Sequence, residues 1–94
     1  MRIVIIYREN SEHARPVIEF KENMRRRYPE KNIEELEIDS KAGATEASLY
    51  GIVQYPAIIV SAHEGNVLGQ WEGLPLPLVD EVAGAAVELE SRSV

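Results

Sequence analysis

The sequence predicts an α/β domain built around one four-stranded mixed sheet. Two short apolar runs, Ile3–Tyr7 and Ala57–Ser61, lack polar alternation, which is typical of strands buried on both faces of a sheet. Between and after these runs, apolar residues recur at spacings of three and four, as along one face of a helix. The resulting order is β-α-β-α-β-β-α. A right-handed βαβ unit followed by a hairpin and a helix gives the strand order 2-1-3-4, with the first two strands parallel. We expect one domain over residues 1–94.

The first helix is predicted by a helical spacing of apolar residues, which are Val17, Phe20, Met24 and Tyr28. Pro16 either lies within the first turn of the helix or kinks it, so the helix begins either irregularly at Ser11 or properly at Pro16. Asn10 or Ser11 is expected to cap it, because a short side-chain oxygen can accept a backbone N–H of the first turn. The helix runs to about Arg27, and Pro29 ends it.

The middle of the chain predicts a strand, a link and a short helix. Apolar and acidic residues alternate within residues 32–39, which indicates a strand with one face toward solvent. Residues 40–43 are expected to form a link, and a helix follows over residues 44–50. Gly51 is expected just past the end of this helix, where the left-handed backbone conformation is common.

The last third of the chain predicts a hairpin and a helix. Residues 63–66 form the turn, in which Gly65 and Asn66 are expected to adopt positive φ. The second strand of the hairpin covers residues 67–72. After a link that contains two prolines, the last helix is expected over residues 78–90.

Composition disfavours several classes of function. Ten lysines and arginines against sixteen acidic residues give a net charge of -6, whereas nucleic-acid binding needs a basic surface. The chain has no cysteine, so it alone can form no disulfide and no thiolate metal site. The two histidines, His13 and His63, are isolated in sequence, and we therefore expect no metal site. No apolar run is long enough to span a membrane, and we expect a cytoplasmic protein without a cofactor.

Three segments carry a resemblance to a known family. Residues 51–60 form a helix stop, an extended link, the Tyr55-Pro56 pair and an apolar strand, and the loop of residues 7–15 follows the first strand. Together with the hairpin of residues 64–73, these segments resemble the thioredoxin/glutaredoxin-like superfamily over nearly the whole chain. The resemblance implies a thioredoxin-like fold in which Pro56 is a cis proline that faces the start of the first helix.

The same resemblance shows what this sequence lacks. The family carries Cys-x-x-Cys at the start of the first helix, and the matching positions here are Ser11 and Ala14. Without the first thiol, neither disulfide exchange nor iron–sulfur ligation of the glutaredoxin kind is possible. The chain therefore resembles a redox-inactive member of this superfamily.

The expected functional site is a binding groove formed by Ser11, His13, Ala14, Tyr55 and Pro56, with no catalytic residue. In the family, the residue before the proline offers its backbone N–H and C=O to an extended substrate, and this use needs no cysteine. We therefore expect a protein or peptide partner. His13 is either a proton shuttle beside the groove or a solvated residue of the first helical turn.

Ser11 leaves further alternatives open. Some glutathione-transferase relatives of this fold use serine, so the chain could be an enzyme that handles glutathione or another small molecule. A nucleophilic serine needs a base within reach, and His13 would not face Ser11 on a helix. Glu9 and Glu12 flank the helix start and would repel an anion, which disfavours glutathione. A natural or engineered cysteine-free form of a thiol-disulfide oxidoreductase also remains open, as does a domain that only adds stability to an assembly.

Two other features have structural explanations. Arg25, Arg26 and Arg27 could bind an acidic partner, but cations in the last turn of a helix also complement its dipole, which is what we expect here. Trp71 is either an exposed binding residue or a cover for the sheet beneath the last helix, and we expect the second role.

Overall fold

Four strands form one mixed sheet in the order β2-β1-β3-β4, as the sequence predicts. The computed structural model describes residues 2–12, 14–62 and 64–92, with the backbone alone for residues 86–92. The elements are, in chain order, β1 (Arg2–Tyr7), α1 (Ala14–Arg27), β2 (Ile33–Glu37), α2 (Lys41–Tyr50), β3 (Ala57–Ser61), β4 (Val67–Glu72) and α3 (Val79–Arg92). Strand β1 pairs parallel with β2 and antiparallel with β3, and β3 pairs antiparallel with β4. No helix in the described part of the chain is long and apolar enough to cross a membrane.

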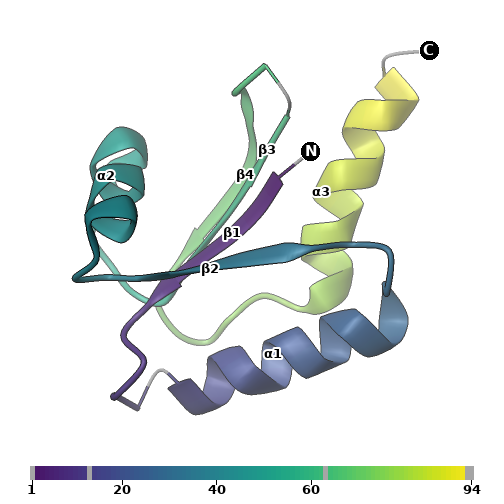
Figure 1. Cartoon of the computed structure of the whole chain (residues 1–94). Helices are drawn as coiled ribbons and strands as arrows, with labels where there is room; N and C mark the ends of the chain where they lie inside the picture. The colour runs from purple at the N-terminus through teal and green to yellow at the C-terminus, as the bar shows by residue number, and fades with distance from the viewer. Residues whose placement is uncertain (1, 13, 63, 93–94) are drawn as a thin grey trace.

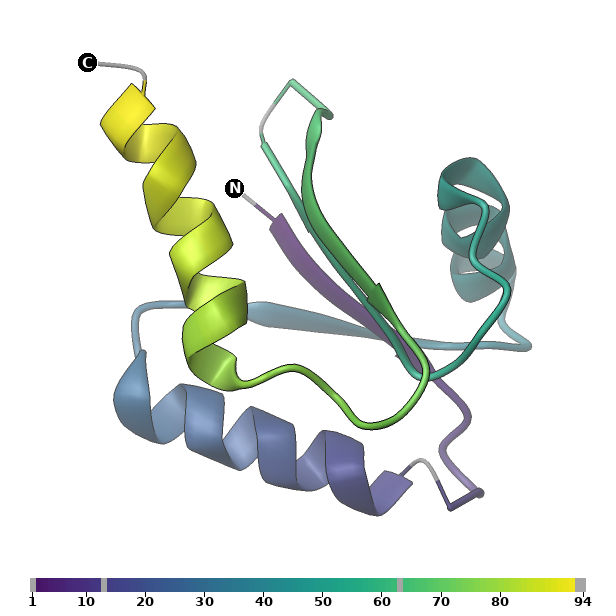
Figure 2. The same cartoon turned by 180° about the vertical axis from the view of Figure 1, so that it is seen from behind.

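The helices divide between the two faces of the sheet (Figures 1 and 2). Helices α1 and α3 pack on one face, and α2 packs on the other. Each face has its own buried cluster, because alternate residues of β1 and β3 point to opposite sides. The α1/α3 cluster consists of Ile3, Ile5, Tyr7, Val17, Phe20, Met24, Ile58, Val60, Val79 and Val82. The α2 cluster consists of Val4, Ile6, Ala47, Ile52, Ala57 and Ile59. The two central strands are buried on both faces, as their apolar sequences predict.

Helix starts and one turn residue differ from the sequence-based expectations. Helix α1 begins at Ala14, between the two predicted starts, so Pro16 lies in its first turn and Ser11 lies three residues before it. Helix α2 begins at Lys41, and the expected link over residues 40–43 is wrong. The reason is that Ser40 is the N-cap, whose hydroxyl oxygen accepts a hydrogen bond from the Gly43 N–H at 2.9 Å.

The expectation for the hairpin turn is correct at only one of its two positions. Gly65 has a φ of 95°, but Asn66 does not adopt positive φ. Gly51 has a φ of 65° and ends α2, as predicted. Trp71 packs against the α1/α3 cluster, which includes two residues of α3, so it covers the sheet as expected. Helix α3 begins one residue later than predicted, at Val79.

The register of the sheet defines two ends. Tyr7 pairs with Glu37, while Ile6 pairs with Ala57. Ala57 in turn pairs with Glu72. Strands β1, β2 and β4 therefore finish, and β3 begins, at one end of the sheet, which we call the exit end. At the opposite end, called the entry end, β1 begins, and α3 finishes beside it (Figures 1 and 2).

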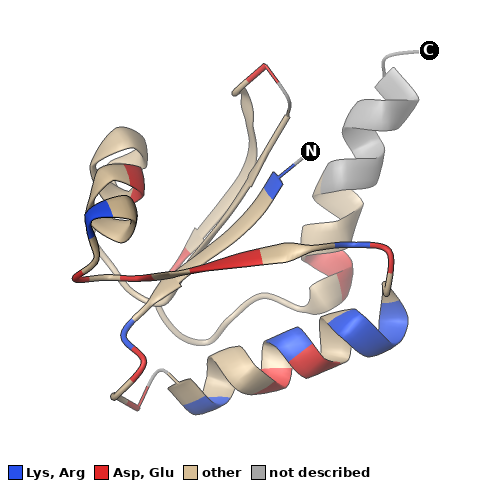
Figure 3. Ribbon diagram, viewed as in Figure 1, with Lys and Arg blue, Asp and Glu red and all other residues tan. Residues whose placement is uncertain are grey.

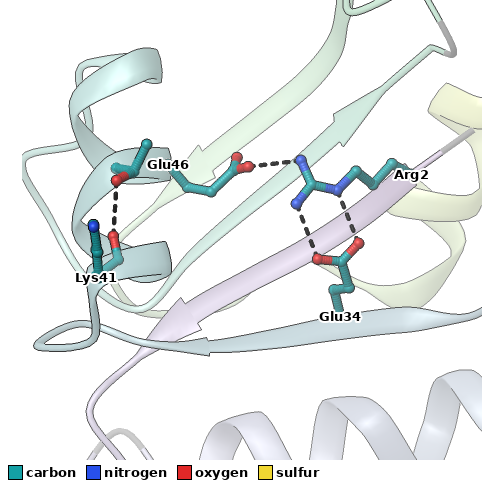
Figure 4. A network of polar contacts seen from close by, with 5 residues as sticks. Arg2, Glu34, Lys41 and Glu46 are labelled. Atoms are coloured by element: carbon teal, nitrogen blue, oxygen red, sulfur yellow. Dashed lines mark hydrogen bonds and ion pairs between the residues drawn. The ribbon is translucent and has the colours of Figure 1, made fainter.

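Arg2 joins three elements near the entry end (Figure 4). Its Nε and Nη2 donate to the two carboxylate oxygens of Glu34 in β2, both at 2.9 Å, and its Nη1 donates to Glu46 of α2 at 2.7 Å. The hydrogen bonds to Glu34 and Glu46 raise the pKa of Arg2, and the hydrogen bond from Arg2 lowers the pKa of Glu34. One guanidinium therefore holds edge strand β2 and helix α2 against β1.

Candidate functional site

The residues of the expected groove lie on two segments that meet the exit end of the sheet. Ser11 and Ala14 belong to the connection between β1 and α1, and Tyr55 and Pro56 precede β3 directly. The pairing of Ile6 with Ala57 brings the last residues of β1 beside the start of β3. His13 lies outside the described residues.

The four described groove residues differ in their surroundings. Pro56 is almost fully buried, and its peptide bond with Tyr55 is cis. Ala14 packs against the α1/α3 cluster, whereas Tyr55 packs against the α2 cluster on the opposite face of the sheet. The strand pairing, rather than a common cluster, therefore relates the two segments.

Ser11 stabilises the turn that leads into α1. Its hydroxyl donates to the backbone carbonyl of Arg8 at 2.7 Å, and its own carbonyl accepts from the N–H of Ala14 at 3.1 Å. The expected cap at Asn10 or Ser11 is not adjacent to the helix, because α1 begins only at Ala14. The hydroxyl of Ser11 is thus used in the local structure of the turn.

Two contacts hold this turn to the end of β2. The Arg8 guanidinium pairs with Asp39 at 2.7 Å, and the backbone N–H of Glu9 donates to the carboxylate of Glu37 at 2.8 Å. Both acidic residues lie at or just after the end of β2. The connection after β1 is therefore anchored to its neighbour in the sheet.

Glu72, at the end of β4, positions the loop before Pro56. One of its carboxylate oxygens accepts the backbone N–H groups of Val53 at 2.9 Å and of Gln54 at 3.2 Å. The side-chain amide of Gln70 donates to the other oxygen at 3.1 Å and to the carbonyl of Tyr50 at 3.2 Å. The hydrogen bonds from Val53, Gln70 and Gln54 lower the pKa of Glu72. Sequence reasoning missed this residue, because a glutamate at the end of a strand carries no local sign of a loop that precedes it by 18 residues.

Gly73 completes the support of the same loop. Its N–H donates to the carbonyl of Pro56 at 3.0 Å, and its φ is 80°. A Cβ atom at this position would lie 2.6 Å from Oε1 of Gln54. The backbone on both sides of Tyr55 is therefore fixed by residues at the end of β4.

Tyr55 lies between these two supported stretches of backbone. Within residues 2–12, 14–62 and 64–92, no group hydrogen-bonds to its N–H or to its carbonyl oxygen. Two large apolar side chains flank the supported loop and face solvent: Val53 is 80% exposed and Leu74 is 50% exposed. The exit end therefore combines exposed apolar side chains with a stretch of backbone that makes no hydrogen bond to any other described residue.

Among the residues that the structure describes, no three histidine or acidic side chains are grouped so that they could hold a metal ion. The carboxylates of the exit end are instead used by neighbouring groups: Glu37, Asp39 and Glu72 each accept a hydrogen bond or pair with a cation.

Comparison with known proteins identifies the fold through a solved structure and not through sequence. No protein-family model matches the chain, and no curated protein matches it in sequence. The chain is similar to the solved structure of thioredoxin 1 from the thermophilic eubacterium Thermosipho africanus TCF52B, with a TM-score of 0.67 and 11% sequence identity. The similarity covers 99% of this chain and 98% of that chain.

Proposed function

The chain has a thioredoxin-like fold without cysteine, and from this we propose that it is a redox-inactive module that binds an extended protein or peptide segment. The contact surface is the exit end of the sheet beside Tyr55 and Pro56. The observation that carries the proposal is the backbone of Tyr55, whose N–H and C=O are unused by the described residues while the backbone before and after it is held in place. Ser11, on the connection between β1 and α1, and Ala14, at the start of α1, would form the other side of the proposed groove, for which the sequence also predicts His13.

An extended segment would bind here by strand addition. Its backbone would donate to the Tyr55 carbonyl and accept from the Tyr55 N–H, which supplies affinity that is independent of sequence. Val53 and Leu74 would supply apolar contacts for its side chains, because both are exposed next to the supported loop. No thiol is needed at any step, so the mode is compatible with the absence of cysteine.

The structure favours this module over an enzyme that handles glutathione through Ser11. The Ser11 hydroxyl donates to the backbone carbonyl of Arg8. Glu9 and Glu12, both exposed, flank the turn and repel an anionic ligand. A peptide that docks through its backbone avoids this repulsion, because it need not bring a carboxylate to the helix start.

The test is a two-dimensional amide NMR titration of the whole chain with a library of acetylated and amidated extended peptides, and separately with reduced glutathione. We expect peptide-induced shifts at residues 53–57 and at the turn before α1. Val53→Asp should abolish them, whereas Val67→Asp should not. Val67 is a matched control because it is an exposed valine, 45% accessible, at the other end of β4.

Two results would refute the proposal. One is a titration in which no peptide of the library shifts residues 53–57. The other is equal loss of binding in Val53→Asp and Val67→Asp, which would mean that exposed apolar residues bind peptides without regard to place. Shifts at Ser11 with glutathione alone would favour the enzyme instead.

A further inference from the structure

Positive charge is concentrated at one corner of an otherwise acidic molecule (Figure 3). Residues 21–31, which span the second half of α1 and the connection to β2, contain five of the ten lysines and arginines but only two glutamates. This segment carries a net charge of +3, so the rest of the chain carries -9. Complementing the helix dipole would require cations only in the last turn, whereas this cluster also contains Lys21, which lies earlier in α1, and Lys31, which lies past its end.

A cleft of about 300 Å³ opens at this corner. Its lining comes from α1, from the connection after it and from the first residue of β2, and consists of Ile18, Lys21, Glu22, Met24, Arg25, Pro29, Lys31, Asn32 and Ile33. Ile18 is 49% exposed, and Ile33 is half-buried. The cleft therefore offers apolar surface between cationic side chains.

The cations of residues 21–31 differ in whether they have an acidic counter-charge. Lys21 pairs with Glu35, and Arg27 pairs with Asp80 at 3.1 Å. Arg25 and Lys31 form no ion pair with any residue in the described ranges. These two line the cleft, so it contains two cations without an ion-pair partner among the described residues.

The neighbouring strand can accommodate an extended ligand. Strand β2 lies at the edge of the sheet, where only β1 pairs with it. Two of its glutamates are already neutralised, since Glu34 binds Arg2 and Glu35 binds Lys21. An acidic segment could therefore approach the open edge of β2 without repulsion from these two carboxylates, because both are already paired with cations.

We propose that this cleft is a second binding site, separate from the exit end, for an extended acidic protein segment that carries an apolar residue. Arg25 and Lys31 would bind its carboxylates, and Ile18 and Ile33 would contact the apolar side chain. Charge complementarity selects this partner, because two unpaired cations line the cleft and one carboxylate, that of Glu22, lies among the same lining residues. Nucleic acid is a poorer fit, since the rest of the chain carries -9 and would repel a phosphate backbone.

The test is an amide NMR titration of the whole chain with a short acetylated and amidated peptide that alternates glutamate and valine. A peptide with lysine in place of glutamate and inorganic phosphate alone are the two comparison ligands. We expect shifts at residues 18, 25 and 31–33, and weaker binding at high salt. Arg25→Glu and Lys31→Glu should each weaken binding about fivefold, as expected for the loss of one exposed charge pair.

Arg26→Glu is the matched control. It makes the same charge change in the same helical turn, but Arg26 is exposed, hydrogen-bonds to Asn23 and does not line the cleft. Unchanged binding in Arg26→Glu supports the cleft. Equal weakening in Arg25→Glu and Arg26→Glu would overturn the proposal in favour of diffuse attraction to a basic helix end. Equal shifts with inorganic phosphate would overturn the proposal, because they would show a site for small anions. Absence of binding by the acidic peptide would also overturn the proposal. Because residues 53–57 report separately, the outcome is independent of binding at the exit end.

Discussion

Replacing Gly73 with alanine tests how the loop before Pro56 is supported. Gly73 has a φ of 80°, which an L-residue adopts only at a cost of about 1–2 kcal/mol. The new Cβ would also lie 2.6 Å from Oε1 of Gln54, so that side chain must move. Because Oε1 is the end of a flexible side chain, the second cost is that of an unfavourable rotamer, about 0.5–1.5 kcal/mol.

Gly51 separates the two costs. It also has positive φ, at 65°, but nothing lies within 4 Å of the position of its Cβ. Gly51→Ala should therefore destabilise by the backbone cost alone, about 1–2 kcal/mol. Gly73→Ala should destabilise by about 1.5–3.5 kcal/mol, the sum of the backbone and rotamer costs. Removing the obstacle with Gln54→Ala should return the effect of Gly73→Ala to the level of Gly51→Ala.

The assay is urea unfolding of Gly51→Ala, Gly73→Ala, Gln54→Ala and the double variant at positions 54 and 73, each compared with the wild type. Unfolding is followed by the fluorescence of Trp71, the only tryptophan in the sequence. The comparison is a double-mutant cycle between positions 54 and 73. Equal effects of Gly73→Ala in the presence and absence of the Gln54 side chain would refute the reasoning, because they would mean that Gln54 does not lie over Gly73.

Three further predictions concern ionisable groups and a helix cap. Since the pKa of Glu72 is lowered by its hydrogen bonds, its contribution is present above the unfolded value of about 4.3 and is lost as the pH falls through the folded value. The difference in urea midpoint between wild type and Glu72→Gln should therefore shrink in acid, and a constant difference would contradict this. Burial is the main cause that raises the pKa of Tyr7 to about 12, and a hydrogen bond to Glu35 is the second. The contribution of Tyr7 to stability is therefore present below about pH 10 and is lost as the pH rises through about 12. Tyr7→Phe should flatten the alkaline loss of stability over this range, and an unchanged slope would count against it. Ser40→Ala should cost about 1 kcal/mol in urea unfolding because the Gly43 N–H loses its acceptor, while Ser48→Ala, at an exposed position in the same helix, should not destabilise.

The sequence predicts the sheet well, because its signals there are local and strong. The apolar runs in β1 and β3 predict strands that are buried on both faces, and both strands lie in the centre of the sheet. The start of α2 was predicted three residues too late, although serine is a preferred N-cap and Ser40 directly precedes the helix. Asn66 shows the limit of such signals, because only Gly65 of the two residues expected at positive φ adopts it.

The candidate site is less accessible to sequence reasoning. The positions of Ser11 and Tyr55 follow from topology, since the end of β1 and the start of β3 lie at the same end of the sheet. The role of Glu72 depends instead on two backbone N–H groups that reach it from a different segment. The unpaired positive charge of the cleft beside Arg25 depends on which cations form ion pairs with distant acidic residues. The helical periodicity of the sequence does not contain that information.

The side of the molecule on which β1 begins determines where a fused domain or a sensor surface would lie. The chain enters the sheet at Arg2 and α3 finishes on the same side of the molecule, while the loop around Tyr55 lies at the exit end (Figures 1 and 2). A neighbouring domain, an affinity tag or a sensor surface joined to either end of this segment would therefore sit away from that loop. Immobilisation through the termini should leave the Tyr55 backbone open to an incoming segment.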